Sequence, residues 1–243
     1  MDYATFTSSL RTLTRTTSTT LTDAEVVSTV NLLKPILERK IVRVGDGRAL
    51  GRTSYTDIVA GQRQYEFPTN FIRMYKLEIN ISGTQWGLLD EIDFNVVDTP
   101  ISTENDITSY FSDSDPKFAM YRNAFNIYTG STLSYVSQGL RLYCAIYSHK
   151  WVTGDLSSTN DISLDVTATD VGFPEEFHEV LMYKCSKFIK QNRDKPLELV
   201  DEEKFLDVPG GLFDDSLATY MQSNRDRKVE GILPDQFNYG YNL

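Results

Sequence analysis

The stretch from Phe173 to Arg193 is the feature that most constrains the fold of this chain. Apolar residues recur at spacings of three and four, as on one face of a helix: Phe177, Val180, Leu181, Cys185, Phe188 and Ile189. The charged residues that we place on the opposite face are Glu176, Glu179, Lys187 and Lys190. Pro174 suits a first helical turn, and acids at the start with bases at the end suit the helix dipole. The pattern predicts an amphipathic helix whose wide apolar face needs a partner.

A second amphipathic helix is predicted near the start of the chain and would supply that partner. Thr22 and Glu25 form a capping box at the start of this helix. Pro35 lies inside the helix and should kink it or split it in two. The two helices together predict the core of a helical bundle, made by Val26, Val30, Leu33, Leu37, Phe177, Leu181 and Phe188. Ile41 extends the apolar stripe. Because a long stretch of chain separates the helices, we expect a module inserted between two halves of one helical layer.

Shorter features surround this second helix. Tyr3, Phe6, Leu10 and Leu13 are spaced as on one face of a short helix. Twelve of the eighteen residues in Thr5–Thr22 are Ser or Thr, which favours a solvated connector. The glycines of residues 45–51 indicate a turn, because their spacing is not that of a dinucleotide-binding loop.

Between Thr53 and Val166 the hydrophobic period changes from a helical spacing to two, which is typical of strands. The predicted strands are Tyr55–Val59, Gln64–Phe67, Tyr75–Ile81, Ile92–Val96, Phe118–Arg122, Phe125–Tyr128, Leu140–Tyr147 and Ile162–Val166. Short strands with regular turn signals predict an antiparallel β-sandwich or barrel-like module. The stretch from Asp98 to Pro116 has no period and is predicted to be a long loop.

We therefore expect an α+β fold, in which a helical bundle carries the inserted antiparallel β-sandwich or barrel-like module and ends in an extended C-terminal arm. The expected parts are N-terminal bundle helices (1–52), the β-domain (53–168), C-terminal bundle helices (169–228) and the arm (229–243). A last helix is expected over Asp214–Lys228, with Leu217, Tyr220 and Met221 on its buried side.

Charge and composition narrow the class of protein. The chain has 243 residues and no run of apolar residues long enough to span a membrane, so we expect a soluble cytosolic protein without a membrane partner. A net charge of −10 argues against a free-standing nucleic-acid binder. The charge is uneven, because residues 90–115 and 153–179 hold only acidic charges whereas residues 1–63 are mildly basic. Solvated loops explain such acidic stretches most simply.

The sequence carries little catalytic chemistry. Cys144 and Cys185 each lie in an apolar run and are predicted to be buried thiols. His149 and His178 have no metal-ligand spacing and are predicted to be surface or capping residues. Walker loops and Gly-x-Ser-x-Gly turns are absent from the sequence. We expect no enzyme activity, no cofactor and no metal.

The order of these pieces resembles the head-to-tail adaptor (connector) proteins of tailed bacteriophages over roughly residues 20–228. Five segments carry the resemblance: Tyr65–Phe71, Ile72–Leu77, Pro116–Tyr121, Phe125–Tyr128 and the helix start Phe173–Phe177. The resemblance implies a structural virion protein of the neck, made in the host cytoplasm. It implies a homo-oligomeric ring of about a dozen copies that joins the portal to the tail or further neck proteins. Genomic DNA would pass through the ring without specific binding.

The same resemblance implies that a C-terminal segment docks onto the portal. In this chain the docking residues of that arm would be Ile232, Leu233, Phe237, Tyr239 and Tyr241. Two alternatives stay open. One is a tail-associated carbohydrate- or receptor-binding module that uses Trp86, Trp151 or exposed tyrosines, and the other is a virion cell-wall hydrolase that uses a carboxylate pair.

Overall fold

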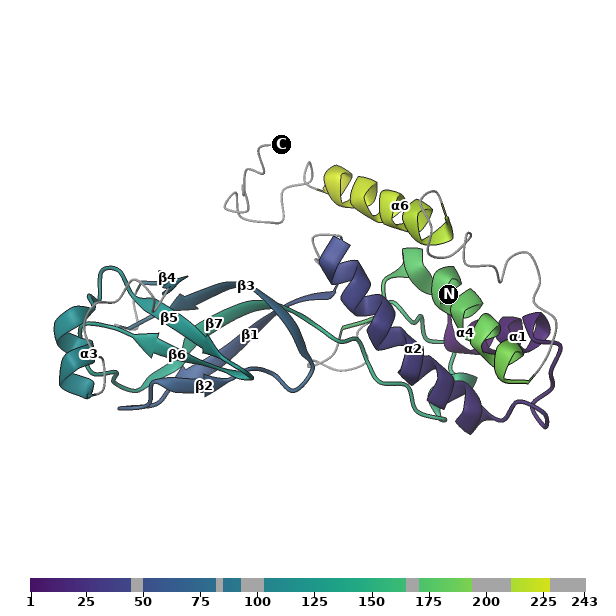
Figure 1. Ribbon diagram of the computed structural model, residues 1–243, viewed down its shortest axis with the longest axis horizontal. Coiled ribbons are helices and arrows are strands. Elements are labelled where there is room, and N and C mark those ends of the chain that lie inside the picture. The colour runs from purple at the N-terminus through teal and green to yellow at the C-terminus, as the bar shows by residue number, and fades with distance from the viewer. Residues whose placement is uncertain (45–49, 82–84, 93–102, 165–170, 194–210, 228–243) are drawn as a thin grey trace. The chain divides into compact units, whose positions relative to one another are not determined.

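The computed structural model describes residues 1–44, 50–81, 85–92, 103–164, 171–193 and 211–227 (Figure 1). Its contacts divide the chain into two compact units. The first unit comprises Met1–Asp46, His149–Ala168 and Gly172–Leu243, and the second comprises Gly47–Ser148 and Thr169–Val171. The first unit holds long helices and the second holds a sheet, so the expected α+β class is confirmed.

The first unit is built from the helices α1 (Tyr3–Leu13), α2 (Asp23–Val44), α4 (His178–Asn192) and α6 (Leu212–Arg227). Two 3-10 turns, η3 (Asp155–Ser157) and η4 (Glu175–Phe177), complete it. Helices α1 and α2 both pack against α4, and α6 packs against η4 and α4. None of the helices in the described part of the chain is long and apolar enough to cross a membrane.

Helix α2 begins where the capping box predicts. The backbone N–H of Thr22 donates to the Glu25 carboxylate at 2.8 Å, and the Glu25 N–H donates to the Thr22 hydroxyl at 3.3 Å. The helix continues through Pro35 without a break, so the prediction of a split helix is wrong. Loss of the proline N–H removes one helical hydrogen bond, and the packing of α2 against α4 outweighs that loss.

The predicted core residues of the two helices lie at different depths. Val26, Val30, Leu37, Phe177 and Leu181 are fully buried. Leu33 and Phe188 are only half-buried.

Two lysines on the same helices are buried instead. Lys34 and Lys190 are each 2% exposed, so the solvent-facing position predicted for Lys190 is wrong. The Lys34 ammonium contacts the Glu38 carboxylate at 3.4 Å and donates to the His149 carbonyl at 2.7 Å. A buried cation needs such partners, and a hydropathy pattern does not show them.

The start of α4 also differs from the prediction. Residues Glu175–Phe177 form a 3-10 turn, and the α-helix begins only at His178. His178 is buried, not at the surface, and its Nε2 lies 2.9 Å from the Phe173 carbonyl oxygen. Burial lowers the pKa of His178 below its ordinary value. The Phe173–Phe177 segment thus closes on itself before the helix begins.

The Thr-rich segment is more ordered than a solvated connector, so that prediction is wrong for Thr5–Leu13. These residues lie in α1, which is capped by Asp2 through the Thr5 N–H at 2.7 Å. Thr7 and Thr12 turn their hydroxyls back to helix carbonyls, which satisfies them without a core partner. The apolar face of α1 covers Trp151, whose ring lies edge-on to Tyr3 at 4.7 Å.

Seven strands form one sheet in the second unit, in the order β1-β7-β3-β4-β5-β6-β2. They are β1 (Gly51–Ile58), β2 (Gln64–Glu66), β3 (Phe71–Ile79), β4 (Gly87–Glu91), β5 (Lys117–Tyr121), β6 (Ala124–Tyr128) and β7 (Val136–Ile146). Among the strand pairs that the structure describes, β4–β5 is parallel and the others are antiparallel. The sheet is mixed and curls into a half-barrel, so of the predicted antiparallel sandwich or barrel-like module the barrel-like form is the nearer, and the expected purely antiparallel pairing is wrong.

One face of this sheet is its core. Leu77, Ile79, Leu140 and Leu142 pair across β3 and β7 and are buried. The aromatic segment before β3 continues the core, because the Phe67 ring stacks on Phe71 at 4.1 Å and packs near Phe125 at 5.2 Å. Cys144 and Cys185, one in each unit, are buried free thiols, as predicted.

Two further predictions need correction, and one falls mostly outside the described residues. The predicted strand Ile162–Val166 is absent from residues 161–164, which form a turn and an isolated bridge between Asp161 and Asp2. Strand β4 was not predicted, and the predicted strand Ile92–Val96 lies mostly outside the described residues. In α6, Leu217 and Tyr220 are buried but Met221 is exposed.

Candidate functional site

The stretch predicted to be a long loop contains a short helix, α3 (Glu104–Tyr110). Its start is fixed by a capping box, in which the Asp106 N–H donates to the Thr103 hydroxyl at 3.3 Å and the Thr103 N–H donates to the Asp106 carboxylate at 2.8 Å. Acids in the first turn also suit the helix dipole. An isolated helix of this length is not stable in water, so further contacts must hold it.

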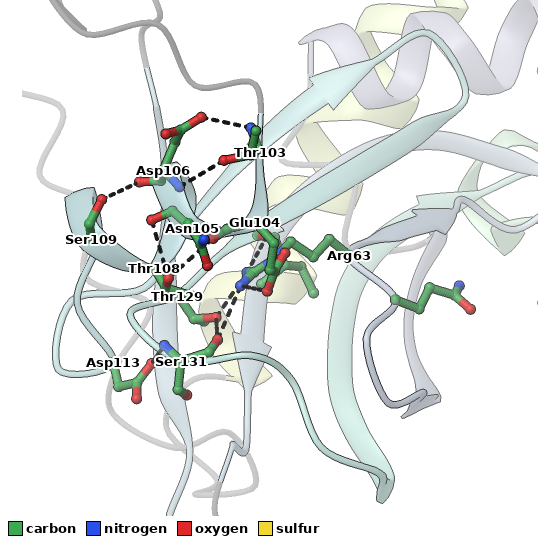
Figure 2. A network of polar contacts seen from close by, with 12 residues as sticks. Arg63, Thr103, Glu104, Asn105, Asp106, Thr108, Ser109, Asp113, Thr129 and Ser131 are labelled. Carbon is green, nitrogen blue, oxygen red and sulfur yellow. Dashed lines mark hydrogen bonds and ion pairs between the residues drawn. The ribbon is translucent and has the colours of Figure 1, made fainter.

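Arg63, which immediately precedes β2, supplies those contacts, as Figure 2 shows. Its Nε and Nη2 donate to the two carboxylate oxygens of Glu104, each at 2.7 Å. The same guanidinium donates to the Ile127 carbonyl at 3.2 Å, the Thr129 hydroxyl at 3.0 Å and the Ser131 carbonyl at 3.1 Å. One planar cation thus ties α3 to the end of β6 and the turn after it, and we call this set the Arg63 network.

Electrostatics agree with the geometry of the Arg63 network. The hydrogen bonds from Arg63 hold the pKa of Glu104 below its ordinary value, more strongly than burial opposes them. The Arg63 side chain is largely buried, whereas Glu104 stays partly exposed. Asp113, just beyond α3, accepts from the Ser131 N–H at 2.9 Å and fixes the same turn.

Aromatic rings hold the other end of α3. Phe111 packs on Tyr128 at 5.0 Å, and Tyr110 lies edge-on to Phe111 at 5.1 Å. Tyr110 is nevertheless 48% exposed, and no residue of α3 is buried. The helix therefore contributes little to the core, and its contacts hold an exposed polar surface in a fixed position.

A second ordered surface lies on the face of the sheet opposite its core. Tyr55, Arg141 and Glu78 form one row across β1, β7 and β3, and Tyr143 and Lys76 form the adjacent row. Glu78 contacts Lys76 at 2.5 Å and also pairs with Arg141. Burial opposes ionisation of Glu78, but hydrogen bonds from Lys76 and Arg141 outweigh it and lower the pKa.

The aromatic rings of this second surface stay accessible. The Arg141 guanidinium lies 4.3 Å from the centre of the Trp86 ring, a cation–π contact. Trp86 and Tyr55 are 38% and 50% exposed. Arg73 is exposed and pairs with Ala145, in the row beyond Tyr143. We call the surface made by Tyr55, Arg73, Lys76, Glu78, Trp86, Arg141 and Tyr143 the aromatic–cationic band.

Trp86, one of the rings singled out in the sequence, lies in the aromatic–cationic band. The other residues named there by number lie elsewhere. The docking residues of the arm, namely Ile232, Leu233, Phe237, Tyr239 and Tyr241, lie outside the described residues. Trp151 is buried under α1 and cannot stack on a sugar ring. Its neighbour His149 points Nε2 at the Asp155 carboxylate, 3.3 Å away. Among the described residues, no group of three His, Cys, Asp or Glu side chains could hold a metal ion.

Sequence reasoning missed both ordered surfaces. Arg63 and Glu104 are far apart in the chain, and only the fold of the sheet brings them together. A local signal for α3 was present, because Thr103 and Asp106 have the spacing of a capping box. The aromatic–cationic band has no such signal, since strand register alone decides which side chains meet.

Comparison with known families gives the class of protein. A family model of phage head–tail adaptors matches residues 1–229, nearly the whole chain and both of its units. The description of that model is the SU10 adaptor protein, and the chain belongs to this family. The resemblance stated from the sequence is thereby confirmed. No curated protein matches the chain.

Family membership defines the chain as a structural adaptor protein of a bacteriophage and a component of the virion. Proteins of this class associate with other head or tail proteins of the phage. The surface of α3 and the aromatic–cationic band are both ordered, which is consistent with contacts between proteins.

Proposed function

We propose that this chain forms a closed homo-oligomeric ring at the phage neck, with about a dozen copies, and connects the portal to the tail. The observation that carries the proposal is the adaptor-family match over residues 1–229. A ring needs one surface of each copy to fit a different surface of the next copy. The second unit carries two ordered surfaces of different character.

In the proposed ring the two units have different roles. In this proposal the first unit is a helical bundle, into which the sheet of residues 47–148 is inserted as a module. Residues 229–243 form an extended arm, and its apolar and aromatic side chains bind the portal. Aromatic anchors of this kind commonly dominate the binding free energy of an interface.

The charge of the chain supports a channel through which DNA passes without specific binding. The net charge is −10, and proteins that hold duplex DNA release counterions through Lys and Arg contacts to phosphate. A strongly acidic ring repels the phosphates and does not retain the duplex. The same reasoning makes affinity for free DNA at physiological salt very weak.

The test is the copy number of this chain in purified virions, measured by quantitative mass spectrometry against the portal protein. A ratio close to that of the portal supports a symmetric ring at the neck. Absence from the particle, or a ratio of many copies to each portal subunit, contradicts the proposal. Cryo-electron microscopy of the neck is an independent measurement that gives the copy number directly.

A further inference from the structure

We propose that α3 of one copy binds the aromatic–cationic band of the neighbouring copy, and that this contact closes the ring. The inference rests on the proposed function, because it names the surfaces through which copies of this chain meet. It requires the two surfaces to be separate, ordered and complementary in charge. The second unit meets each requirement.

The two surfaces lie toward opposite ends of the strand order of one sheet. The band spans β1, β7 and β3, at the beginning of the strand order. Helix α3 is tied by Arg63 to β6 and the turn after it, next to the other edge strand, β2 (Figure 1). A contact between them is therefore heterologous, which is the type of contact that generates a ring when the rotation closes.

The charges of the two surfaces are complementary. The band holds three cations, Arg73, Lys76 and Arg141, against the single carboxylate of Glu78. The surface of α3 and the turn after it holds four carboxylates, those of Glu104, Asp106, Asp113 and Asp115. Arg63 pairs with Glu104 and Lys117 pairs with Asp115, so the surface is negative on balance. Complementary fields of this kind steer association and fix its register.

Both surfaces also carry accessible aromatic rings on rigid supports. Tyr110 is held by the contact of Phe111 with Tyr128, and on the band Trp86 is held by Arg141. Aromatic residues and arginine are enriched among the residues that dominate binding at interfaces. Because these side chains are already ordered in the single chain, little conformational entropy is lost when the surfaces meet.

The outward face of α3 is identified by its exposure. Asn105 and Ser109 are both exposed and lie one helical turn apart, whereas Asp106, Ile107 and Thr108 are half-buried. A cation at residue 109 would face the neighbouring band without touching the Arg63 network. Its position in the last turn also suits the helix dipole, so the helix itself should tolerate the change.

The experiment is a charge exchange between the two surfaces of the full chain. We compare Arg73→Glu on the band, Ser109→Lys on α3, and the double variant that carries both. Arg39→Glu and Ser28→Lys repeat the same changes at exposed positions on α2 and serve as controls. Sedimentation velocity measures assembly of the protein alone and in the presence of purified portal.

We expect each single variant to weaken association by about tenfold or more, because like charges then face each other. The double variant should recover most of that loss, since the new glutamate faces the new lysine. Tyr110→Ala should weaken association without any change of charge. Added salt should weaken the wild-type contact and should have less effect on the single variants.

Other results overturn the inference. If the single variants assemble like the wild type while rings still form, α3 and the band do not meet, and the proposed ring stands without them. If both single variants are weak and the double variant is no stronger, the two residues do not face each other. If the wild-type chain forms no ring either alone or on the portal, the proposed function and this inference both fail.

Discussion

At the scale of single residues, Arg63 makes the largest set of polar contacts in the described part of the second unit. Arg63→Met should lower the free energy of unfolding by about 1–3 kcal/mol, because the carbonyls and the hydroxyl that it contacts lose their donor. Arg63→Lys should recover only part of the loss, since an ammonium lacks the planar fork. Urea unfolding measures the change, and Arg73→Met is the control, expected within about 0.5 kcal/mol of the wild type. If Arg63→Met and Arg73→Met lowered the free energy of unfolding equally, the role given to Arg63 would be contradicted.

The same contact predicts a pH dependence. Arg63 lowers the folded-state pKa of Glu104 below the unfolded value of 4.5, so the ion pair contributes fully above that value. Its contribution is lost as the pH falls through the lowered pKa, when Glu104 takes up a proton. The stability difference between wild type and Glu104→Gln should therefore be largest near neutral pH and shrink below about pH 4. Unfolding in urea at a series of pH values measures it, and a difference that grows in acid would refute the assignment.

In the first unit, Lys34 and its partner Glu38 are both buried, whereas the partner of Arg63 is partly exposed. Lys34→Met leaves the Glu38 carboxylate buried without the ammonium beside it, and should cost about 3–5 kcal/mol. The double change to Lys34→Met and Glu38→Met should be far milder, since it removes both charges. Fluorescence of the buried Trp151 reports unfolding of this unit, and Lys187→Met on half-buried Lys187 is the control. A double variant as unstable as Lys34→Met would show that the pair is not the cause.

At the scale of elements, the capping box contributes to the stability of α3 together with the Arg63 network. Thr103→Ala removes the side chain that accepts the Asp106 N–H, and should destabilise the helix by about 1 kcal/mol. Hydrogen exchange of the α3 amides should quicken accordingly, whereas exchange in β7 should not change. Thr108→Ala, within the same helix, is the control and should leave exchange the same or slower, because alanine favours helix. Equal exchange in both variants would mean that the cap is unimportant.

Elements with a local signal could be predicted from the sequence, and those that depend on distant partners could not. Helix α2 begins at its capping box, and β7 follows the period of two from Leu140 to Cys144. Helix α3 also had a capping signal, but its side chains form no apolar stripe, because none of them is buried. Hydrophobic periodicity therefore did not predict α3, because this helix packs no apolar face against the core.

The curl of the sheet shows a second limit. The parallel contact of β4 with β5 joins what would otherwise be separate antiparallel ladders, and nothing in either strand indicates that pairing. Short strands with regular turn signals left a sandwich and a barrel-like module open, and the structure has one mixed half-barrel. The burial of Lys34 likewise depends on a carbonyl of His149, which is remote in sequence. Both outcomes depend on the three-dimensional fold and not on local propensity.

At the scale of the whole molecule, assembly and docking are separate tasks in the proposed neck ring. The closing contact would use the second unit, and portal binding would use residues 229–243. Changes in one should then leave the other intact. A chain without the arm should still assemble with copies of itself, whereas a chain with a reversed charge on α3 should still carry a functional arm.

Deleting residues 232–243 tests this separation. The truncated chain should lose attachment to the portal, because Phe237, Tyr239 and Tyr241 would supply the aromatic anchors of that interface. Each single change to alanine at these three residues should weaken attachment by about 1–2 kcal/mol or more, while Asn238→Ala and Asn242→Ala serve as neighbouring controls. Co-sedimentation with purified portal measures attachment, and sedimentation velocity of the truncated chain alone measures assembly. Unchanged attachment after the deletion would place the portal contact elsewhere on the chain, and loss of self-assembly would show that the arm belongs to the ring contact itself.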